Sequence, residues 1–257
     1  MRINTNVGAL NSSKNAFINT MATESSMRKL SSGLRISRAA DDAAGLSIAN
    51  KLRAQSRSLT VASANAEQGN AMLQIAEGSA STIQRILERQ KELIIQREST
   101  GNNSSVSATL EAEISTLSQE TTRIINSTNF QGSSVFASLA FQVSDGTAGG
   151  TVTVDASLAA STVTVGASAS IGTVDTALTA INSVLANIGA GQNRLDYTVQ
   201  NLKSAVVNVK AAESTIRDVD MAEEMATYTK NNILTQAAQA MLSQANQSSQ
   251  SVLSLLR

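Results

Sequence analysis

The chain has 257 residues, with 20 Lys or Arg balanced by 20 Asp or Glu, and it contains no Pro, Cys or His. Without His or Cys, the usual zinc, haem and iron–sulfur ligand sets and the Ser-His-Asp and Cys-His catalytic arrangements are excluded, so we expect no cofactor, no metal and no enzymatic activity. Zero net charge argues against nucleic acid or an anionic membrane as the main partner, and the absence of Pro permits long unbroken helices.

The first predicted helix carries a thin apolar stripe. Ile3, Leu10 and Phe17 are seven residues apart, and Val7 lies on the adjacent row. This spacing is typical of a helix that packs along one narrow seam. No segment of signal-peptide type and no apolar run of about 18 residues is visible, so we expect neither a secretion signal nor a membrane span.

A junction is predicted after this helix. Gly33 is expected to act as its C-cap or hinge. Asp41 and Asp42 suit the N-terminus of the next helix, where carboxylates accept backbone N–H groups; a metal or acid–base pair is the weaker interpretation. Charges near this junction and the corresponding C-terminal one fit either solvated surface or pairing between subunits; they are Arg35, Arg38, Arg217, Asp218 and Asp220.

Two long heptad seams predict the central helices. The first begins near Gly45 and is sustained for about six heptads, and the second covers roughly 181–216. A shorter amphipathic helix follows the turn sequence at 101–104. Three apolar stripes of this kind are best buried in a long antiparallel bundle. The principal seam residues are Leu52, Leu59, Leu73, Leu87, Ile94, Ile181, Ile188, Leu195, Leu202 and Val209.

Residues 131–175 differ in composition, being rich in Ser, Thr, Val and Gly. The segments 151–154 and 162–165 both alternate Thr and Val with period two, and Asp145-Gly146 and Gly149-Gly150 are turn signals. We expect one or two β-hairpins inserted in the bundle; a disordered loop is the alternative.

The last predicted helix has no charged residue between Asn231 and Leu256. A helix with apolar and uncharged polar faces is expected where protein covers both faces. Because both terminal stripes are thin, we expect the two ends to be disordered in the free monomer and to fold against each other and neighbouring copies on assembly. Packing on the monomer's own bundle is the alternative. The residues expected to make these contacts are Ile3, Val7, Leu10, Phe17, Leu234, Met241, Val252, Leu255 and Leu256.

Several segments, in order, resemble bacterial flagellins, the filament subunits of the flagellum. They read MRINTN at 1–6, KLSSGLRI at 29–36, DDAAGL at 41–46, GQNRL at 191–195 and ESTIRDVDMA at 213–222. The resemblance covers roughly residues 1–130 and 176–257. It implies a mainly α fold: a long antiparallel coiled-coil-like helical bundle with paired terminal helices and a small inserted β-hairpin region.

The resemblance also implies a layered subunit. Residues 1–44 plus 220–257 would form the inner tube of the filament, 45–130 plus 176–219 the outer-tube bundle, and 131–175 a variable surface region with candidate O-glycosylation sites. The large outer domains of many relatives are expected to be absent. Function is then mechanical: the extracellular filament, built by self-assembly, acts as a propeller for motility.

Export and partners follow from the same resemblance. The chain would leave unfolded through the flagellar type III channel, helped by an export chaperone, and would meet a filament cap and hook–filament junction proteins. Free flagellin is also a ligand of Toll-like receptor 5. The resemblance makes Arg89, Glu92 and Leu93 the candidate receptor contacts, whereas Glu88 and Lys91 depart from the family pattern.

Three other functions are alternatives to this one. A hook–filament junction or other flagellar axial protein would share the terminal heptads but usually diverges in the segments at 31–45 and 217–220. A carboxylate hydrolase would need a clustered acidic pocket. A coiled-coil signalling rod would associate without the charge-free tail.

Overall fold

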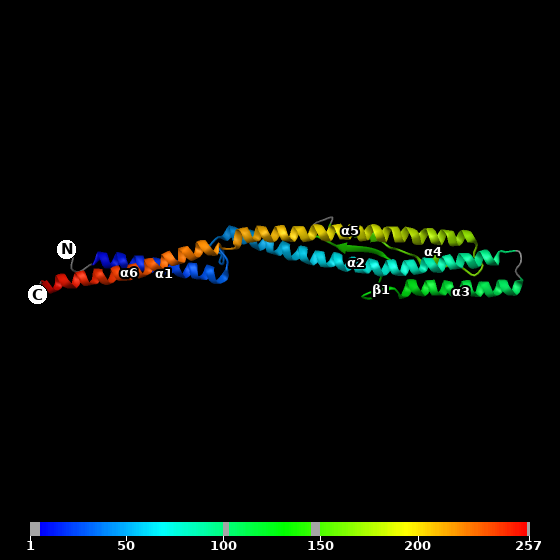
Figure 1. Cartoon of the computed structure of the whole chain (residues 1–257), viewed down its shortest axis with the longest axis horizontal. Coiled ribbons are helices and arrows are strands. Elements are labelled where there is room, and N and C mark those ends of the chain that lie inside the picture. The colour runs from blue at the N-terminus through cyan, green and yellow to red at the C-terminus, as the bar shows by residue number, and fades with distance from the viewer. Residues whose placement is uncertain (1–5, 100–102, 145–149, 256–257) are drawn as a thin grey trace. The chain divides into compact units, whose positions relative to one another are not determined.

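The computed structural model describes residues 6–99, 103–144 and 150–255, with side chains up to Ser248, and it is mainly α (Figure 1). Ile3 and Leu256 therefore lie outside the described residues, as do the side chains of Val252 and Leu255. The helices are α1 (Val7–Ser32), α2 (Ala43–Arg97), α3 (Ser104–Ser127), α4 (Ala160–Val163), α5 (Ile171–Arg217) and α6 (Met221–Leu255). The strands are β1 (Asn129–Phe130), β2 (Ser133–Ser134), β3 (Ser138–Gln142) and β4 (Thr151–Asp155).

The chain divides into two compact units. One contains residues 1–54 and 209–257, and the other contains residues 55–208. We call them the terminal unit and the central unit. The boundaries expected from the sequence were 44/45 and 219/220, with 131–175 as a separate region, whereas 131–175 here belongs to the central unit. The assignment of these parts to filament tubes stays a prediction.

The central unit is an antiparallel bundle, as the heptad seams predicted. Polar pairs join α2 to α5 in opposite chain directions: Glu67–Lys203, Asn70–Asp196, Glu77–Gln192 and Lys91–Asp175. The helices α2 and α3 are also antiparallel, as shown by the contacts Arg89–Glu113 and Ser79–Thr128. Figure 1 shows α2 between α5 and α3. A single hydrophobic cluster between residues 62 and 202 forms the core of this unit.

A β-hairpin packs against this bundle. β3 and β4 are antiparallel, with Leu139 opposite Val154 and Phe141 opposite Val152. The valines of β4 are buried and its threonines are exposed, so the expected alternation at 151–154 is confirmed. A second, very short pair, β1 and β2, is joined by Gln131 and Gly132, which both have positive φ, as the tightest two-residue hairpin turns require.

The expectation of a strand at 162–165 is wrong. Residues 160–163 form the single helical turn α4, in which the Thr164 hydroxyl donates to the Ala160 carbonyl at 2.6 Å. Val163 and Val165 are fully buried, whereas Thr162 and Thr164 are exposed. The Thr-Val alternation at 162–165 therefore predicted correctly which side chains face the core. A helical turn followed by extended backbone also buries alternate residues, so this pattern does not require a paired strand.

The terminal unit is built around two paired helices, α1 and α6, which lie side by side (Figure 1). The Asn6 side chain caps α1 by accepting from the Ala9 N–H at 3.0 Å. Gly33 ends α1 in the left-handed conformation at φ 69°, so its expected C-cap role is confirmed. Asp220 caps α6 by accepting from the Ala222 N–H at 2.9 Å.

Candidate assembly surface

Large apolar side chains are exposed on both helices of the terminal unit. Phe17 is 66% exposed and Met241 is 62% exposed, although side chains of this kind are normally buried. The predicted contact residues with described side chains are all exposed: Val7, Leu10, Phe17, Leu234 and Met241. Ile18, Met21, Met27, Met221, Met225 and Ile233 are exposed as well. An apolar surface of this extent is typical of an interaction site.

Little of the terminal unit is buried. Among its described residues, the buried apolar side chains are Ile36, Ala49 and Ala238, and Ser26 is the buried polar one. Alanine and serine contribute little apolar area. The seam between α1 and α6 therefore removes far less apolar surface from water than the core of the central unit does, and the free energy that holds these helices is correspondingly small.

Polar contacts tie α1 to α6 near both ends of the pair. The Asn6 amide donates to the Ala245 carbonyl at 2.9 Å, and Lys29 lies 3.7 Å from Glu224. These contacts set the helices antiparallel and fix their register. They do not cover the exposed apolar side chains, so the pair presents these to solvent.

The segment after α1 crosses the link between α5 and α6. The Arg35 N–H donates to the Arg217 carbonyl at 2.7 Å, and the Val219 N–H donates to the Gly33 carbonyl at 3.1 Å. The Arg35 guanidinium also donates to the Ile216 carbonyl at 2.7 Å. Two backbone segments about 180 residues apart in sequence are thereby paired, which connects both terminal helices at one point.

The carboxylates of Asp41 and Asp42, near this crossing, accept hydrogen bonds from backbone N–H groups. Asp41 accepts from the N–H groups of Arg38 at 2.9 Å and Ser37 at 3.1 Å, and these bonds lower the pKa of Asp41. Asp42 accepts from the Gly45 N–H at 2.9 Å, which is the expected helix cap. A Cβ at Gly45 would lie 2.8 Å from Ile36 Cδ1 and would also contact the Asp42 carboxylate, so a side chain there would require both neighbouring side chains to shift.

An ion-pair cluster was missed by the sequence analysis. Arg53 donates to Glu213 at 3.0 Å, and Arg217 lies 3.7 Å from the same carboxylate. Arg217 Nε is buried without a hydrogen-bond partner. Arg53 and Glu213 are 160 residues apart, so no local spacing could have shown that they meet. Of the charges that the sequence analysis singled out, Arg35, Arg217, Asp218 and Asp220 have partners within the chain.

The predicted bundle seam lies along the inside of the helices over most of its length. Leu52, Leu59 and Val209, toward one end of the seam, are only partly buried. The remaining seam residues are buried: Leu73, Leu87, Ile94, Ile181, Ile188, Leu195 and Leu202.

The candidate receptor contacts are separated by the fold. Arg89 and Glu92 are exposed and pair with each other at 3.0 Å, and Arg89 also reaches Glu113 at 3.3 Å. These carboxylates, Glu92 first, raise the pKa of Arg89. Leu93 is only 1% exposed, because it faces the core of the bundle, so its side chain offers no surface to a partner in this conformation.

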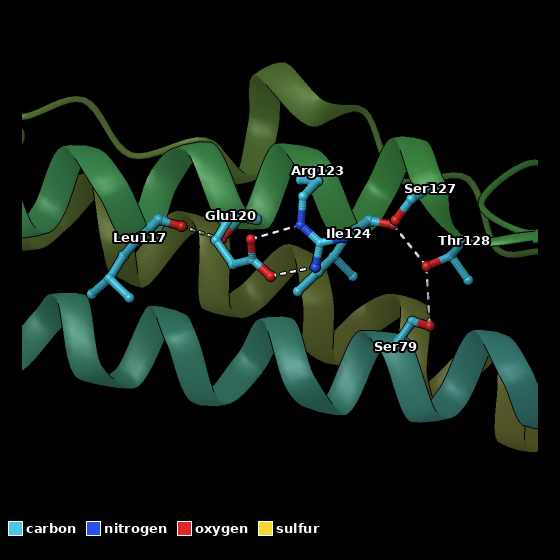
Figure 2. Close-up of polar contacts among 8 residues, drawn as sticks. Ser79, Leu117, Glu120, Arg123, Ile124, Ser127 and Thr128 are labelled. Atoms are coloured by element: carbon cyan, nitrogen blue, oxygen red, sulfur yellow. Dashed lines mark hydrogen bonds and ion pairs between the residues drawn. The ribbon is translucent and has the colours of Figure 1, made fainter.

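A shallow groove between α2 and α3 is lined by hydroxyl groups (Figure 2). The Thr128 hydroxyl contacts Ser79 Oγ at 3.2 Å and donates to the Ile124 carbonyl at 2.7 Å. Arg123 and Glu120 form a two-pronged pair beside it on α3. The contact between Thr128 and Ser79 joins the C-terminal end of α3 to α2, whereas the pair of Arg123 with Glu120 lies within α3.

Residues 6–99, 103–144 and 150–255 contain no cluster of three or more Asp, Glu, His or Cys that could hold a metal ion. None of the helices in that part is both long and apolar enough to cross a membrane.

Family comparisons agree with this architecture. Residues 3–140 match the bacterial flagellin N-terminal helical region, and residues 171–256 match the bacterial flagellin C-terminal helical region. The unmatched stretch between them contains β4 and α4.

Relatives match over the full length. The chain is 40% identical to a flagellin of Bacillus subtilis and 38% identical to the flagellar filament 33 kDa core protein of Treponema phagedenis, in each case covering both proteins completely. A crystal structure of Bacillus cereus flagellin matches with 28% identity and a TM-score of 0.48, covering 58% of this chain and 94% of that one.

The long paired helices α1 and α6, together with the family-model matches and the full-length relatives, define a class of structural protein that builds filaments. The chain belongs to the bacterial flagellin family, and it is a structural subunit of the flagellar filament.

Proposed function

We propose that α1 and α6 are the segments through which copies of this chain enclose one another in the core of the filament. The observation that carries the proposal is the terminal unit's exposed apolar surface, which includes Phe17 and Met241, beside its very small buried core. Burying such side chains between copies removes apolar area from water that the single chain leaves exposed. Because the contacting surfaces differ, copies add head to tail and side to side into an open helical polymer.

The long, charge-free stretch of α6 supports an enclosed position. Residues 231–248, of which the side chains are described, contain no Asp, Glu, Lys or Arg. Placing this stretch against neighbouring helices desolvates no charge, whereas burying a single unpaired charge would oppose assembly strongly. The exposed amides and hydroxyls can meet water or one another.

The test is polymerisation of the full chain with Phe17→Ser. Since Phe17 is already exposed in the single chain, the helix content of the free subunit should stay unchanged. The concentration of chain left unassembled should rise by about tenfold to a hundredfold, because each copy loses the burial of one phenyl ring, about 1.5–3 kcal/mol. Circular dichroism measures the helix content of the free subunit, and sedimentation with electron microscopy measures how much chain is left unassembled.

Asn15→Ser on the same helix is the matched control. Asn15 is exposed and polar, so removing its amide takes away no apolar area and should leave polymerisation near that of the unaltered chain. If Phe17→Ser assembles as well as Asn15→Ser, α1 does not supply the contact.

Export and partners are part of the same proposal. The chain leaves the cell unfolded through the flagellar type III channel, with a chaperone bound to its C-terminal region, and joins an extracellular filament beneath a cap protein and beyond hook–filament junction proteins. It works by assembly and not by catalysis, and it needs no cofactor, nucleic acid or membrane. The absence of Pro and Cys supports rapid folding at the filament tip, because neither prolyl isomerisation nor disulfide formation can delay it.

Recognition of the free subunit by Toll-like receptor 5 is proposed for Arg89 and Glu92. Both are exposed on α2, and the guanidinium of Arg89 is held in place by Glu92 and Glu113. A binding measurement with dissociated chain should show weaker receptor binding for Arg89→Ala than for Arg85→Ala, which removes an exposed arginine one turn earlier. Equal binding by the two variants would remove the assignment.

A further inference from the structure

The methionines are distributed unevenly between the two units. The sequence contains seven methionines and no cysteine, so their thioethers are the only sulfur atoms of the chain. Met72, in the central unit, is buried at 8% exposure. The other described methionines all belong to the terminal unit and are about half exposed: Met21, Met27, Met221, Met225 and Met241.

The exposed apolar residues of the central unit are of a different kind. They include Val61, Ile75, Ile95, Val106, Tyr197 and Val207, and no methionine is among them in the part of the chain that the structure describes. Thioethers are therefore concentrated on the surface of α1 and α6, the helices that the proposed function places between copies. Met27 also lines an open groove together with Glu24, Arg28 and Ser37.

We propose that these five methionines make the free subunit sensitive to peroxide, so that oxidation of the terminal unit blocks its assembly into filaments. This inference rests on the proposed function of α1 and α6. The modification site is the set of exposed thioether sulfurs, and the reagent class is a hydroperoxide.

The chemistry is a two-electron oxygen transfer. A sulfur lone pair attacks one oxygen of the peroxide, the O–O bond breaks and an S–O bond forms. The departing hydroxide takes up the remaining proton as water, so sulfur is oxidised by two electrons and the peroxide is reduced by two. Accessibility selects the residues, since Met72, at 8% exposure, meets the reagent less often than the half-exposed methionines do.

The product is incompatible with the proposed contact. A methionine thioether is flexible and apolar, and it fills irregular gaps between helices well. Its sulfoxide is polar and a strong hydrogen-bond acceptor, so burying it against an apolar neighbour leaves a desolvated oxygen without a donor. In the free chain the same oxygen faces water, and α1 and α6 can remain paired. Oxidation thus weakens the assembled state more than the free one.

Assembly would in turn protect the sulfurs. Once copies enclose α1 and α6, the thioethers are no longer exposed, so the sensitive interval is the time between folding and incorporation. Reduction of the sulfoxides by methionine sulfoxide reductases restores the thioether and should restore assembly competence.

The experiment uses the purified full chain, dissociated into soluble subunits and treated with hydrogen peroxide that is then removed with catalase. Peptide mass spectrometry locates the sulfoxides, and sedimentation after seeding with filament fragments measures assembly. We expect sulfoxide at the five exposed methionines before Met72, and at least about a tenfold rise in the concentration of chain left unassembled. Treatment with both reductase types should reverse that rise.

Two comparisons sharpen the test. Preformed filaments given the same peroxide should gain sulfoxide more slowly at the five positions than free subunits do. Met72→Leu should stay as sensitive to peroxide as the unaltered chain. A variant with all five exposed methionines replaced by leucine should assemble equally before and after peroxide treatment. The treated variant is compared with the same variant left untreated, so any effect of the leucines themselves on assembly cancels.

The possible results distinguish failure of the oxidation inference from failure of the proposed assembly function. If chain carrying sulfoxide at all five positions assembles as well as untreated chain, or if the reductases do not restore lost assembly, the inference is wrong while the proposed function stands. If Met72 is oxidised as fast as the five, accessibility does not select the residues and the inference is also wrong. If untreated chain forms no filaments, the proposed function itself fails.

Discussion

Gly191 on α5 lies where the β-hairpin meets the bundle. A Cβ at this position would be 2.6 Å from Val154 Cγ2 and 3.2 Å from Leu73 Cδ1. Val154 is β-branched and held in β4 by its pairing with Leu139, so it cannot turn away easily. The absence of a side chain at Gly191 therefore sets how closely the hairpin approaches the helix.

Gly191→Ala should accordingly destabilise the central unit. We expect a loss of about 1–3 kcal/mol in the free energy of unfolding, because the added methyl group overpacks a filled site. Gly189→Ala, on the same helix with nothing within 4 Å of the new Cβ, should instead stabilise it by about 0.5–1 kcal/mol. Urea unfolding followed by circular dichroism measures both; a shift of the two variants in the same direction would contradict the packing argument.

Asp41 provides a prediction about pH. The N–H groups of Arg38 and Ser37 donate to its carboxylate and lower its pKa below the ordinary value of 3.8. Because the folded pKa is the lower one, the stabilising contact is fully present above pH 3.8 and is lost as the pH falls through the folded pKa. NMR titration of the Asp41 carboxyl carbon should give a midpoint below 3.8; a midpoint at or above that value would show that the contact is absent in solution.

At the scale of elements, one arginine joins three segments of the central unit. Arg97, at the C-terminus of α2, donates to the carbonyls of Ala167 at 2.6 Å and Ala169 at 2.7 Å, and lies 3.8 Å from Glu111 on α3. The side chain is 13% exposed, so these bonds are largely shielded from water. A planar guanidinium can reach both carbonyls at once, whereas an ammonium group cannot do so with the same geometry.

Arg97→Lys should therefore destabilise the central unit although charge is kept. We expect a loss of about 1 kcal/mol, the worth of one hydrogen bond, together with faster amide exchange at the start of α5. Arg85→Lys is the matched control on the same helix, since Arg85 is exposed and its guanidinium donates to the nearby Thr82 hydroxyl at 3.3 Å. Its effect should stay within about 0.5 kcal/mol. Equal losses of stability for both variants would mean that the two hydrogen bonds from Arg97 to the carbonyls of Ala167 and Ala169 do not stabilise the central unit.

The same sequence pattern does not always produce the same secondary structure in this chain. The alternation at 151–154 and that at 162–165 are the same pattern, yet one is strand β4 and the other is a helical turn followed by extended backbone. β4 has β3 as a pairing partner. Val163 and Val165 are buried as β4's valines are, but their segment pairs with no strand in the described part of the chain.

At the scale of the whole molecule, the two units differ in buried apolar surface. The central unit holds the hydrophobic cluster, whereas the described part of the terminal unit buries little beyond Ile36, Ala49 and Ala238. Regions with few buried contacts open at low free-energy cost and exchange their amide protons quickly. The expectation that the chain ends order only on assembly stays a prediction, and exchange can decide it.

Hydrogen exchange of dilute free chain should show weak protection in α1 and α6 and strong protection in the parts of α2, α3 and α5 that hold the buried cluster. In filaments, protection in α1 and α6 should rise to that of the central helices, because neighbouring copies then exclude water from them. Strong protection of α1 and α6 in the dilute chain, equal to that of α2 in the central unit, would show that the terminal pair is stable by itself.

The sequence by itself determined the helices and their inward faces. Heptad spacing records which positions must leave water, so Leu73, Leu87, Ile94, Ile181 and Leu195 could be placed in a core before any coordinates. Gly33 and Asp42 could be assigned as caps because backbone conformation and capping depend on neighbours only a few residues away.

Only the tertiary structure decided which distant segments meet. The pairing of Arg53 with Glu213, the crossing of residues 33–35 over 217–219, the fit of Val154 against Gly191 and the burial of Leu93 all depend on how helices lie against one another. Such contacts join residues up to about 180 positions apart, and no local spacing encodes them. Periodicity specifies the face that a helix turns inward; the three-dimensional packing specifies what that face touches.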